Sequence, residues 1–495
     1  MRYIWLIIGI VMASSCKKWL DVKPVSQVSE EDLFKTEAGF EEALTGIYSR
    51  CSAIELYGFE LNCGFPEVLA QNYTLVGQDF HQYQQTAIYN YKDDDFIRRK
   101  DDVWRGLYNA IVNCNLLLEN LDKNGDILTN DKYAIIRAEA LALRAYLHFD
   151  VLRLFAPSFK SNASANAIPY VTTFSNKVTP LSTVSETLDQ IVADLKQAKE
   201  IIRPFDPILK AGYVTGYPWV YYDEQTGNDQ TEDDAATLFL TQRRHRMNYY
   251  AICGALARVL LYAEQKEEAL QNALEVIDSN KFPWTNNDNF IESDPEKKDR
   301  ILYKELVFAW YIPNMRTELA NKFTTEATGL FLEDNACKAL YETGGVGGDD
   351  NRFKEWFRLI SGTGNNISRR HLQKYMRENE INRHFLVAPA IRLSEMYYIA
   401  SECAYDADPE KGATYLNTVR SNRGMGTPLT ISNKEQLMEE LVKEARKEFY
   451  AEGQIFYMYK RLNRGITAQL GGNVPPSDQI FVLPLPDYEI EFGNR

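Results

Sequence analysis

The chain has 495 residues and a formal net charge of −14 at pH 7, with 69 acidic side chains against 55 lysines and arginines. A surface of this sign repels a phosphate backbone on the whole, which argues against a nucleic-acid partner. The seven cysteines form no CxxC pair and hence no zinc framework, and no Ser-, Gly- or Pro-rich linker divides the chain, so we expect one large compact unit.

The first residues have the features of a lipoprotein secretion signal. Arg2 precedes the apolar run Tyr3–Met12, which is too short to span a bilayer, and small residues then lead to Cys16. This pattern predicts that residues 1–15 are a signal peptide and that the mature chain begins at Cys16, linked to acyl chains that hold it on a membrane surface. Ala13 stands where the usual bacterial pattern has leucine, and an uncleaved apolar tail is the alternative.

Residues 57–91 form an aromatic stretch that is expected to be rich in loops. Tyrosines are interleaved there with Asn and Gln side chains, and the candidates for ligand contact are Tyr73, Asn72 and Tyr83. Sugars expose flat C–H faces and hydroxyl groups, so a glycan site needs exposed rings and amides of this kind. The alternative is that the rings fill small cores within their own loops.

Helical periodicity dominates the organisation of the chain. The clearest case is residues 132–156, where Ala134, Ala138 and Ala142 fall four apart on one stripe and Pro157 follows the end. Small residues at that spacing let a neighbouring helix approach closely, so we expect a core helix. Apolar stripes predict further helices over 39–50, 102–120 and 184–201.

A second long loop region covers residues 205–241 and displays Trp219, Tyr221 and Tyr222 close together. Loops of this length without regular structure are uncommon unless they have a function. A solvent-facing bulge of alternate aromatics has little core to fill, so we predict ligand contact here, with filling of the loop's own core as the alternative. Trp284, in another loop rich in Asn, is the remaining aromatic candidate.

Two helix pairs with short turns are predicted in the second half of the chain. They cover residues 249–264 with 267–279, and 394–405 with 411–422. Small residues occupy the places where a tetratricopeptide unit packs its two helices, which indicates degenerate repeats of that kind. The basic run Arg243–Arg246 is expected to be a solvated lead into the first of these helices. The chain is therefore predicted to be mostly α.

A series of short motifs runs in order along nearly the whole chain. They are Trp19–Pro24 after the cysteine, the helix around Ala138–Phe155, Ala255–Val259, Ile391–Glu395, Leu416–Arg420, Glu444–Gly453 and Leu483–Pro486. In type, order and spacing they resemble the SusD/RagB family of nutrient-binding outer-membrane lipoproteins of Bacteroidetes. Asp350 and Arg352 resemble a D-x-R element of that family, and Ala445 departs from it, since arginine is common there.

The resemblance implies a SusD-like fold in which about four tetratricopeptide-like helix pairs pack against a loop-rich ligand-binding region. It implies a single SusD-like domain over residues 16–495, with an N-terminal part of about 16–240 and a C-terminal part of about 241–495. It also implies a lipid-anchored protein at the surface of the outer membrane that captures oligosaccharides and delivers them to a SusC-like TonB-dependent transporter. Capture of a peptide or glycopeptide by the same scaffold is the alternative.

Catalytic motifs are missing from the sequence. It contains no G-x-S-x-G elbow and no H-E-x-x-H helix, and His148, within the predicted core helix, is interpreted as a buried imidazole. We therefore predict a binding protein without a metal or cofactor. A glycosidase, which needs only two acids at the right separation, and a tetratricopeptide adaptor are the other classes. No acidic run has the spacing of a calcium loop, but calcium binding is left open, as is a disulfide between Cys51 and Cys63.

Overall fold

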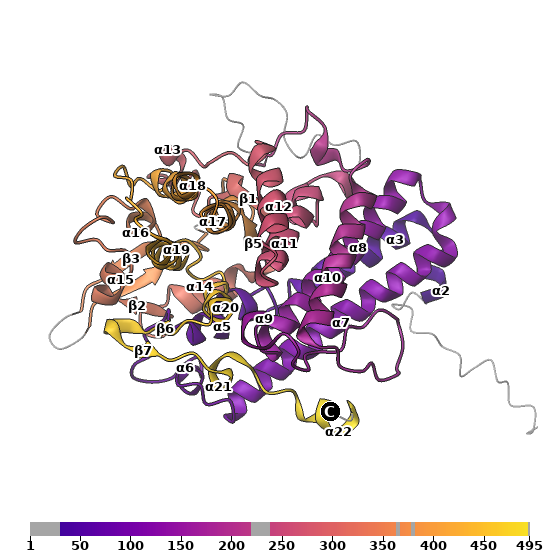
Figure 1. The fold of residues 1–495 in the computed structure, drawn as a ribbon, viewed down its shortest axis with the longest axis horizontal. Helices are drawn as coiled ribbons and strands as arrows, with labels where there is room; N and C mark the ends of the chain where they lie inside the picture. Colours follow the sequence, from indigo (N-terminus) through magenta and orange to yellow (C-terminus); the bar gives the residue numbers. More distant parts are fainter. Residues whose placement is uncertain (1–29, 219–237, 363–366, 378–381, 494–495) are drawn as a thin grey trace, which may run out of the picture.

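Helices form most of the N-terminal part of the protein. The computed structural model describes residues 30–218, 238–362, 367–377 and 382–493 (Figure 1). The helices of the first part are α2 (Glu30–Leu33), α3 (Glu37–Cys51), α4 (Glu60–Cys63), α5 (Phe65–Leu69), α6 (Gln84–Ala87), α7 (Asp94–Asn124), α8 (Asn130–Phe155), α9 (Phe159–Asn162) and α10 (Val184–Ile202). The four predicted helices are confirmed as α3, α7, α8 and α10. α7 begins earlier than predicted because the Asp93 side chain caps it, accepting from the backbone N–H of Phe96.

α8 is the central helix of this part. Nearly every side chain from Ala134 to Phe155 is buried, and α7 and α10 both pack against it. Its four-residue alanine spacing allows this close approach, as predicted. Arg144 on α8 forms a bidentate ion pair with Asp194 on α10, with both N–O distances at 2.8 Å. The helix ends before Pro157, which disfavours a helical conformation at the preceding residue.

The C-terminal part contains the predicted helix pairs. Its long helices are α11 (Tyr249–Tyr262), α12 (Lys266–Asp278), α17 (Leu393–Ala404), α18 (Pro409–Ser421), α19 (Lys434–Glu448) and α20 (Ile455–Leu462). α11 packs on α12 and α17 on α18, which confirms both pairs, and α12 packs on α17 to join them. Gly412 allows α18 to lie this close to the end of α17, because a Cβ there would lie 2.8 Å from the Cα and Cβ atoms of Tyr405.

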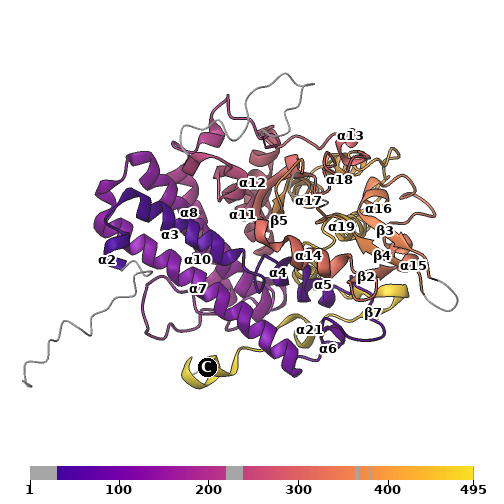
Figure 2. The same cartoon turned by 180° about the vertical axis from the view of Figure 1, so that it is seen from behind.

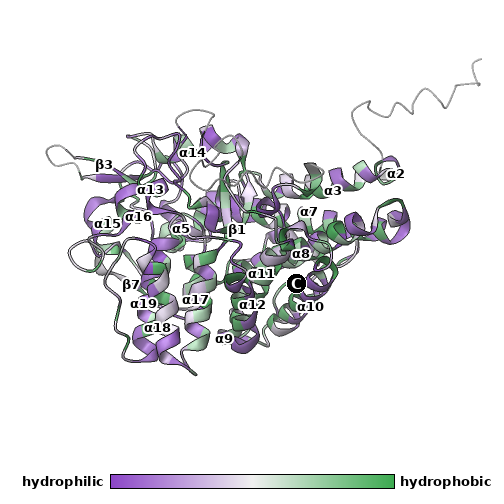
Figure 3. Cartoon of the chain, turned by 90° about the horizontal axis from the view of Figure 1, so that it is seen from above, coloured by the Kyte–Doolittle hydropathy of each residue, from purple (hydrophilic) through white to green (hydrophobic). Residues whose placement is uncertain are grey.

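Short strands and helices make up the rest of the C-terminal part. They are β1 (Leu306–Tyr311), β2 (Phe331–Glu333), β3 (Phe357–Ile360), β4 (Arg369–Leu372), β5 (Val387–Arg392), β6 (Ile466–Thr467), β7 (Asn473–Val474), α13 (Asn287–Phe290), α14 (Arg316–Phe323), α15 (Asp334–Leu340), α16 (Asn351–Glu355), α21 (Asp478–Phe481) and α22 (Asp487–Gly493). β1 pairs with β5, β4 lies between β2 and β3, and β6 pairs with β7, all antiparallel. Seen from above, the helices α12, α17, α18 and α19 lie opposite α13, α14 and β3 (Figure 3). We call the side that carries α14 the loop-rich face.

A buried ion-pair cluster connects α16 to α18 and α19. Its fully buried members are Glu305, Asp350, Arg352, Arg420, Arg423, Glu444 and Glu448. Arg352 donates to Asp350 at 2.7 Å and to Glu444 and Glu448 at 2.9 Å each. Burial alone would raise the pKa of Glu444, but the charges of Arg352, Lys447 and Arg420 lower it to about 2. The D-x-R element and the first half of the Glu444–Gly453 motif therefore hold the helices together.

The prediction that Arg243–Arg246 is solvated was wrong. Arg243 and Arg244 are fully buried, and Arg243 donates to Glu139 at 2.8 Å and to Asp206 at 2.9 Å. Because these acids come from α8 and from the turn after α10, the basic run ties three segments together. These acids lie far from the run along the chain, so no local spacing pattern predicts the pairing.

Cys51 and Cys63 are both buried and free, so no disulfide joins them. Burial raises the pKa of both thiols well above the ordinary value, which makes them unreactive core groups. Within the described part of the chain, no three His, Cys, Asp or Glu side chains come together as a metal site. Helices long and apolar enough to cross a bilayer are likewise absent from the described residues.

Candidate functional site

α14 is the helix around which the loop-rich face is built. It follows β1 after one short turn, and the loop after it leads into β2. Figure 2 shows α14 on the side of the molecule turned away from the viewer in Figure 1, near α4, α5 and β2. An eight-residue helix such as this one is about 12 Å long. Exposed aromatic rings occur near both ends of it, and we describe the two ends in turn.

A cleft of about 140 Å³ lies beyond the C-terminal end of α14, between the loop of residues 74–84 and that of residues 327–331. The Nε2 atom of His81 is 2.7 Å from the carbonyl oxygen of Thr328. The backbone N–H of Thr74 donates to the carbonyl oxygen of Phe331 at 2.8 Å. These bonds fix one loop against the other. Phe80 is 49% exposed at this cleft, so its ring is available for stacking.

An aromatic platform lies at the N-terminal end of α14. Tyr311, the last residue of β1, is 43% exposed, and its ring stacks on His245 with the centroids 5.3 Å apart and the planes 14° apart. Phe385 meets Tyr311 edge to face at 5.6 Å. Burial, with a contribution from the charge of Arg244, lowers the pKa of His245 to about 3. The imidazole is therefore neutral at pH 7 and supports Tyr311 as an aromatic ring rather than as a cation.

The segment that carries Trp219, Tyr221 and Tyr222 lies outside the described residues, as does Cys16. Its two described ends lie near the platform. Tyr217 donates to Asp299 at 2.8 Å on one side, and on the other Arg246, one residue after His245, donates to the carbonyl oxygen of Phe239 at 2.9 Å. Ligand contact by these three aromatics stays a prediction.

Three of the predicted site residues lie in the core. Tyr73 is 6% exposed and donates to the carbonyl oxygen of Cys63, while the Asn72 amide donates to Glu67; both bonds are 2.8 Å. Tyr83 is fully buried and donates to Glu60 at 2.9 Å. These side chains hold the loops beneath the cleft, which matches the core-filling alternative, so we leave them out of the proposed ligand surface.

Trp284 is half-buried, away from α14. Its ring packs against Tyr397 on α17, with the centroids 5.1 Å apart, and the guanidinium of Arg423 lies 5.2 Å from it. It therefore covers the edge of the buried ion-pair cluster. Contact between Trp284 and a ligand remains an untested prediction, with a packing role as the simpler interpretation.

Sequence reasoning missed Tyr311 and Phe385. Tyr311 ends an apolar run in which Leu306–Trp310 are all buried, so its place as the last residue of the strand, and not alternation, leaves its ring exposed. Phe80 lay inside the aromatic stretch 57–91 but was not singled out. No local pattern gives the pairing with His245, which comes from a segment far from β1 in the sequence.

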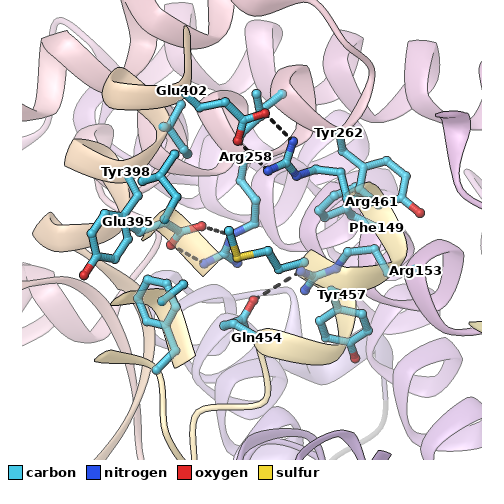
Figure 4. A pocket seen from close by; sticks show the side chains of 16 residues that line it. Phe149, Arg153, Arg258, Tyr262, Glu395, Tyr398, Glu402, Gln454, Tyr457 and Arg461 are labelled. Atoms are coloured by element: carbon cyan, nitrogen blue, oxygen red, sulfur yellow. Dashed lines mark hydrogen bonds and ion pairs between the residues drawn. The ribbon is translucent and has the colours of Figure 1, made fainter. Parts of the chain in front are cut away.

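A further cavity lies within the helical layer, between α8, α11, α17, α19 and α20 (Figure 4). Its volume is about 90 Å³. Arg258 pairs with Glu395 and Arg461 with Glu402, each at 2.6 Å, and Arg153 also makes its hydrogen bonds within the protein. Because each of these arginines has an acidic or amide partner, with only the Nε atom of Arg153 buried without one among the described residues, we interpret the cavity as part of the packing between helices.

Profiles of two protein families match the chain. The one described as "Starch-binding associating with outer membrane" matches residues 18–204, and the one described as "SusD family" matches residues 360–473. Among curated proteins, a SusD-like protein of Formosa agariphila is 21% identical, over 93% of this chain and 91% of that protein.

Solved structures share the fold. A SusD superfamily protein from Bacteroides thetaiotaomicron VPI-5482 superimposes with a TM-score of 0.71 at 21% identity, covering 93% of this chain and 98% of that one. A SusD-like carbohydrate binding protein from Bacteroides vulgatus ATCC 8482 gives a TM-score of 0.68 at 18% identity, covering 93% and 96%. The mostly helical SusD-like fold predicted from the sequence is thereby confirmed.

Proposed function

Because the chain belongs to the SusD/RagB family, we propose that it is a cell-surface carbohydrate-binding protein that captures oligosaccharides and passes them to a SusC-like TonB-dependent transporter. Two matches support a carbohydrate ligand by their descriptions, the starch-binding family and the carbohydrate binding protein of Bacteroides vulgatus. The proposal includes a lipid on Cys16 that holds the protein at the outer membrane. It assigns binding, and no catalysis, to the chain.

The observation that carries the proposal is the exposed ring of Tyr311, supported from below by the neutral ring of His245. A flat ring held rigidly by stacking loses little freedom when the C–H face of a sugar packs on it. Phe80 lines the cleft beyond the other end of α14, a helix that is itself about 12 Å long. A ligand that touched both rings would therefore be an oligosaccharide rather than a single sugar.

Affinity electrophoresis on a panel of polysaccharides tests this proposal. The protein would be the chain from residue 17 onward, which keeps every described residue. We expect retardation on at least one neutral glycan, and a loss of about tenfold or more in affinity in Tyr311→Ala. Phe174→Ala, which removes a ring that is 45% exposed on a different surface, is the matched control and should bind as the wild type does.

The outcomes separate the parts of the proposal. Retardation that persists in Tyr311→Ala but disappears in Trp219→Ala would keep the function and move the site to residues 219–222. Absence of retardation on every glycan, with retention of a peptide library, would replace oligosaccharide capture by the peptide alternative. For the partner and the anchor, the native protein should copurify with a TonB-dependent transporter from outer membranes, and Cys16→Ala should leave the membrane fraction.

A further inference from the structure

A second pocket, separate from the loop-rich site, lies where α15, α19, α20 and β6 meet. Its volume is about 320 Å³. Three cations line it, Lys443, Arg446 and Arg464, together with the carboxylates of Glu342 and Glu439. In Figure 1 these elements lie together on the side of the molecule opposite α2 and α3. No feature of the sequence pointed to this pocket.

The two arginines of this pocket differ from the other arginines of the described chain. The others have a hydrogen bond or an ion pair, or in the case of Arg316 a further interaction, as Arg258 and Arg461 illustrate with their glutamates. The side chains of Arg446 and Arg464 have none among the described residues, and the Nε atom of Arg446 is buried without a partner. Burying the edge of a guanidinium in this way costs free energy unless an acceptor is supplied.

The acids of the pocket do not provide that acceptor. Glu342 pairs with the fully buried Lys447 at 2.6 Å and lies 3.7 Å from Lys443, so its charge is already compensated. Glu439 has no ion pair and faces solvent. Lys443 in turn pairs with Glu440 at 2.7 Å, so the excess of positive charge comes from the two arginines, against the single carboxylate of Glu439, in a protein whose net charge is −14. The buried hydroxyl of Tyr459, which also lacks a hydrogen-bond partner, belongs to the same lining.

We propose that this pocket binds an acidic sugar through its carboxylate or sulfate group. Guanidinium groups match the paired oxygens of such a group, and two unpaired ones can hold it from two directions. The volume of about 320 Å³ leaves room for a sugar ring beyond the acidic group. Thr467 and Glu439 line the pocket and offer acceptors to its hydroxyl groups.

Isothermal titration calorimetry on matched pairs of ligands tests this proposal. Galacturonic acid is compared with galactose, and glucose 6-sulfate with glucose, so each pair differs mainly in the acidic group. We expect heat of binding for at least one acid and none for its neutral partner, with affinity falling as salt is raised. Comparison of the two acids, and of sodium sulfate alone, identifies which anionic group the pocket takes.

Variants assign the binding to the pocket. The double variant Arg446→Gln with Arg464→Gln should lower the affinity for the acidic sugar by at least about tenfold. Arg105→Gln, which removes an exposed arginine on α7, should leave that affinity unchanged. If the double variant melts early, Arg464→Gln alone, at the edge of the fold, is used. Equal binding of acid and neutral sugar, or unchanged binding in these variants, would overturn the proposal. Tyr311→Ala should leave this binding intact, so the two sites fail independently.

Discussion

The buried ion-pair cluster and the loop-rich face treat their large side chains in opposite ways. In the cluster, Arg352 on α16 is fully buried and surrounded by acids that satisfy it. On the loop-rich face, Tyr311 and Phe80 are large rings that the fold leaves 43% and 49% exposed. A group that is buried with its partners is explained by stability, whereas an exposed ring on a rigid support is explained by what it can bind. This difference decides which residues we assign to structure and which to ligand.

The largest expected effect is on the buried cluster. Arg352→Met should lower the free energy of unfolding by about 3–5 kcal/mol, because it leaves Glu444 and Glu448 buried without their shared cation. Urea unfolding followed by circular dichroism measures this. Arg358→Met is the control, since Arg358 lies 3.8 Å from Glu326 with half its side chain exposed, and it should change stability by less than about 0.5 kcal/mol. Equal effects of the two substitutions would mean that the cluster adds no stability.

Packing between the helix pairs should give the next largest effect. Gly412→Ala places a Cβ 2.8 Å from Tyr405 and 3.0 Å from the carbonyl oxygen of Ser401, so α18 must move and we expect a loss of about 1–3 kcal/mol. Gly46→Ala in α3 meets nothing within 4 Å and should instead stabilise by about 0.5–1 kcal/mol. Thermal melts of the two variants should therefore shift in opposite directions. A shift in the same direction would remove close helix contact as the reason for Gly412.

The helix pairs could be predicted because their evidence is local. Apolar stripes and small residues repeat within one helix, as at Ala134, Ala138 and Ala142, and the stop before Pro157 is equally local. The role of Arg243 could not be found this way, because its acids Glu139 and Asp206 lie in other segments. Aromatic composition likewise located the region of the cleft but could not separate exposed rings from buried ones.

Tyr73 and Tyr83 show that last limit most clearly. They share the composition of the stretch 57–91 with Phe80, yet the fold buries both tyrosines and exposes the phenylalanine. Tyr311 ends a strand whose other five residues are all buried, so alternation along the strand could not have singled it out. The identity of its support, His245, depends on how two segments far apart in the chain pack together. The sequence therefore predicts that the ligand surface is aromatic better than it predicts which residues form it.

A buried carboxylate beneath the cleft should give stability an unusual dependence on pH. Burial raises the pKa of Glu67 to about 7, although the Asn72 amide and the backbone N–H groups of Ala451 and Gly453 donate to it. The unfolded chain loses this proton near pH 4.5 and the folded protein only near pH 7, so the contribution is present below pH 4.5 and is lost as pH rises to 7.

The slope of unfolding free energy against pH should thus be more negative in the wild type than in Glu67→Gln between pH 5 and 7. The difference cannot exceed one proton, or about 1.4 kcal/mol per pH unit. Glu444 affects the pH dependence of stability in the opposite direction, because its pKa is lowered to about 2. Its contribution to the free energy of unfolding is present above pH 4.5 and is lost as pH falls. Parallel slopes in the wild type and Glu67→Gln would show that the carboxyl stays ionised in the folded protein.

The smallest expected effect comes from removing the hydroxyl group of a buried tyrosine, compared with that of an exposed one. Tyr73→Phe removes the donor to the carbonyl oxygen of Cys63 and leaves that buried oxygen without its bond, so we expect a loss of about 1 kcal/mol and no change in glycan binding. Tyr311→Phe keeps the exposed ring and should change neither stability nor stacking. Unfolding midpoints and retardation on glycan gels, measured on both variants, check this. A binding defect in Tyr73→Phe would mean that the ligand opens the core beneath the cleft, and the division between buried and exposed rings would no longer hold.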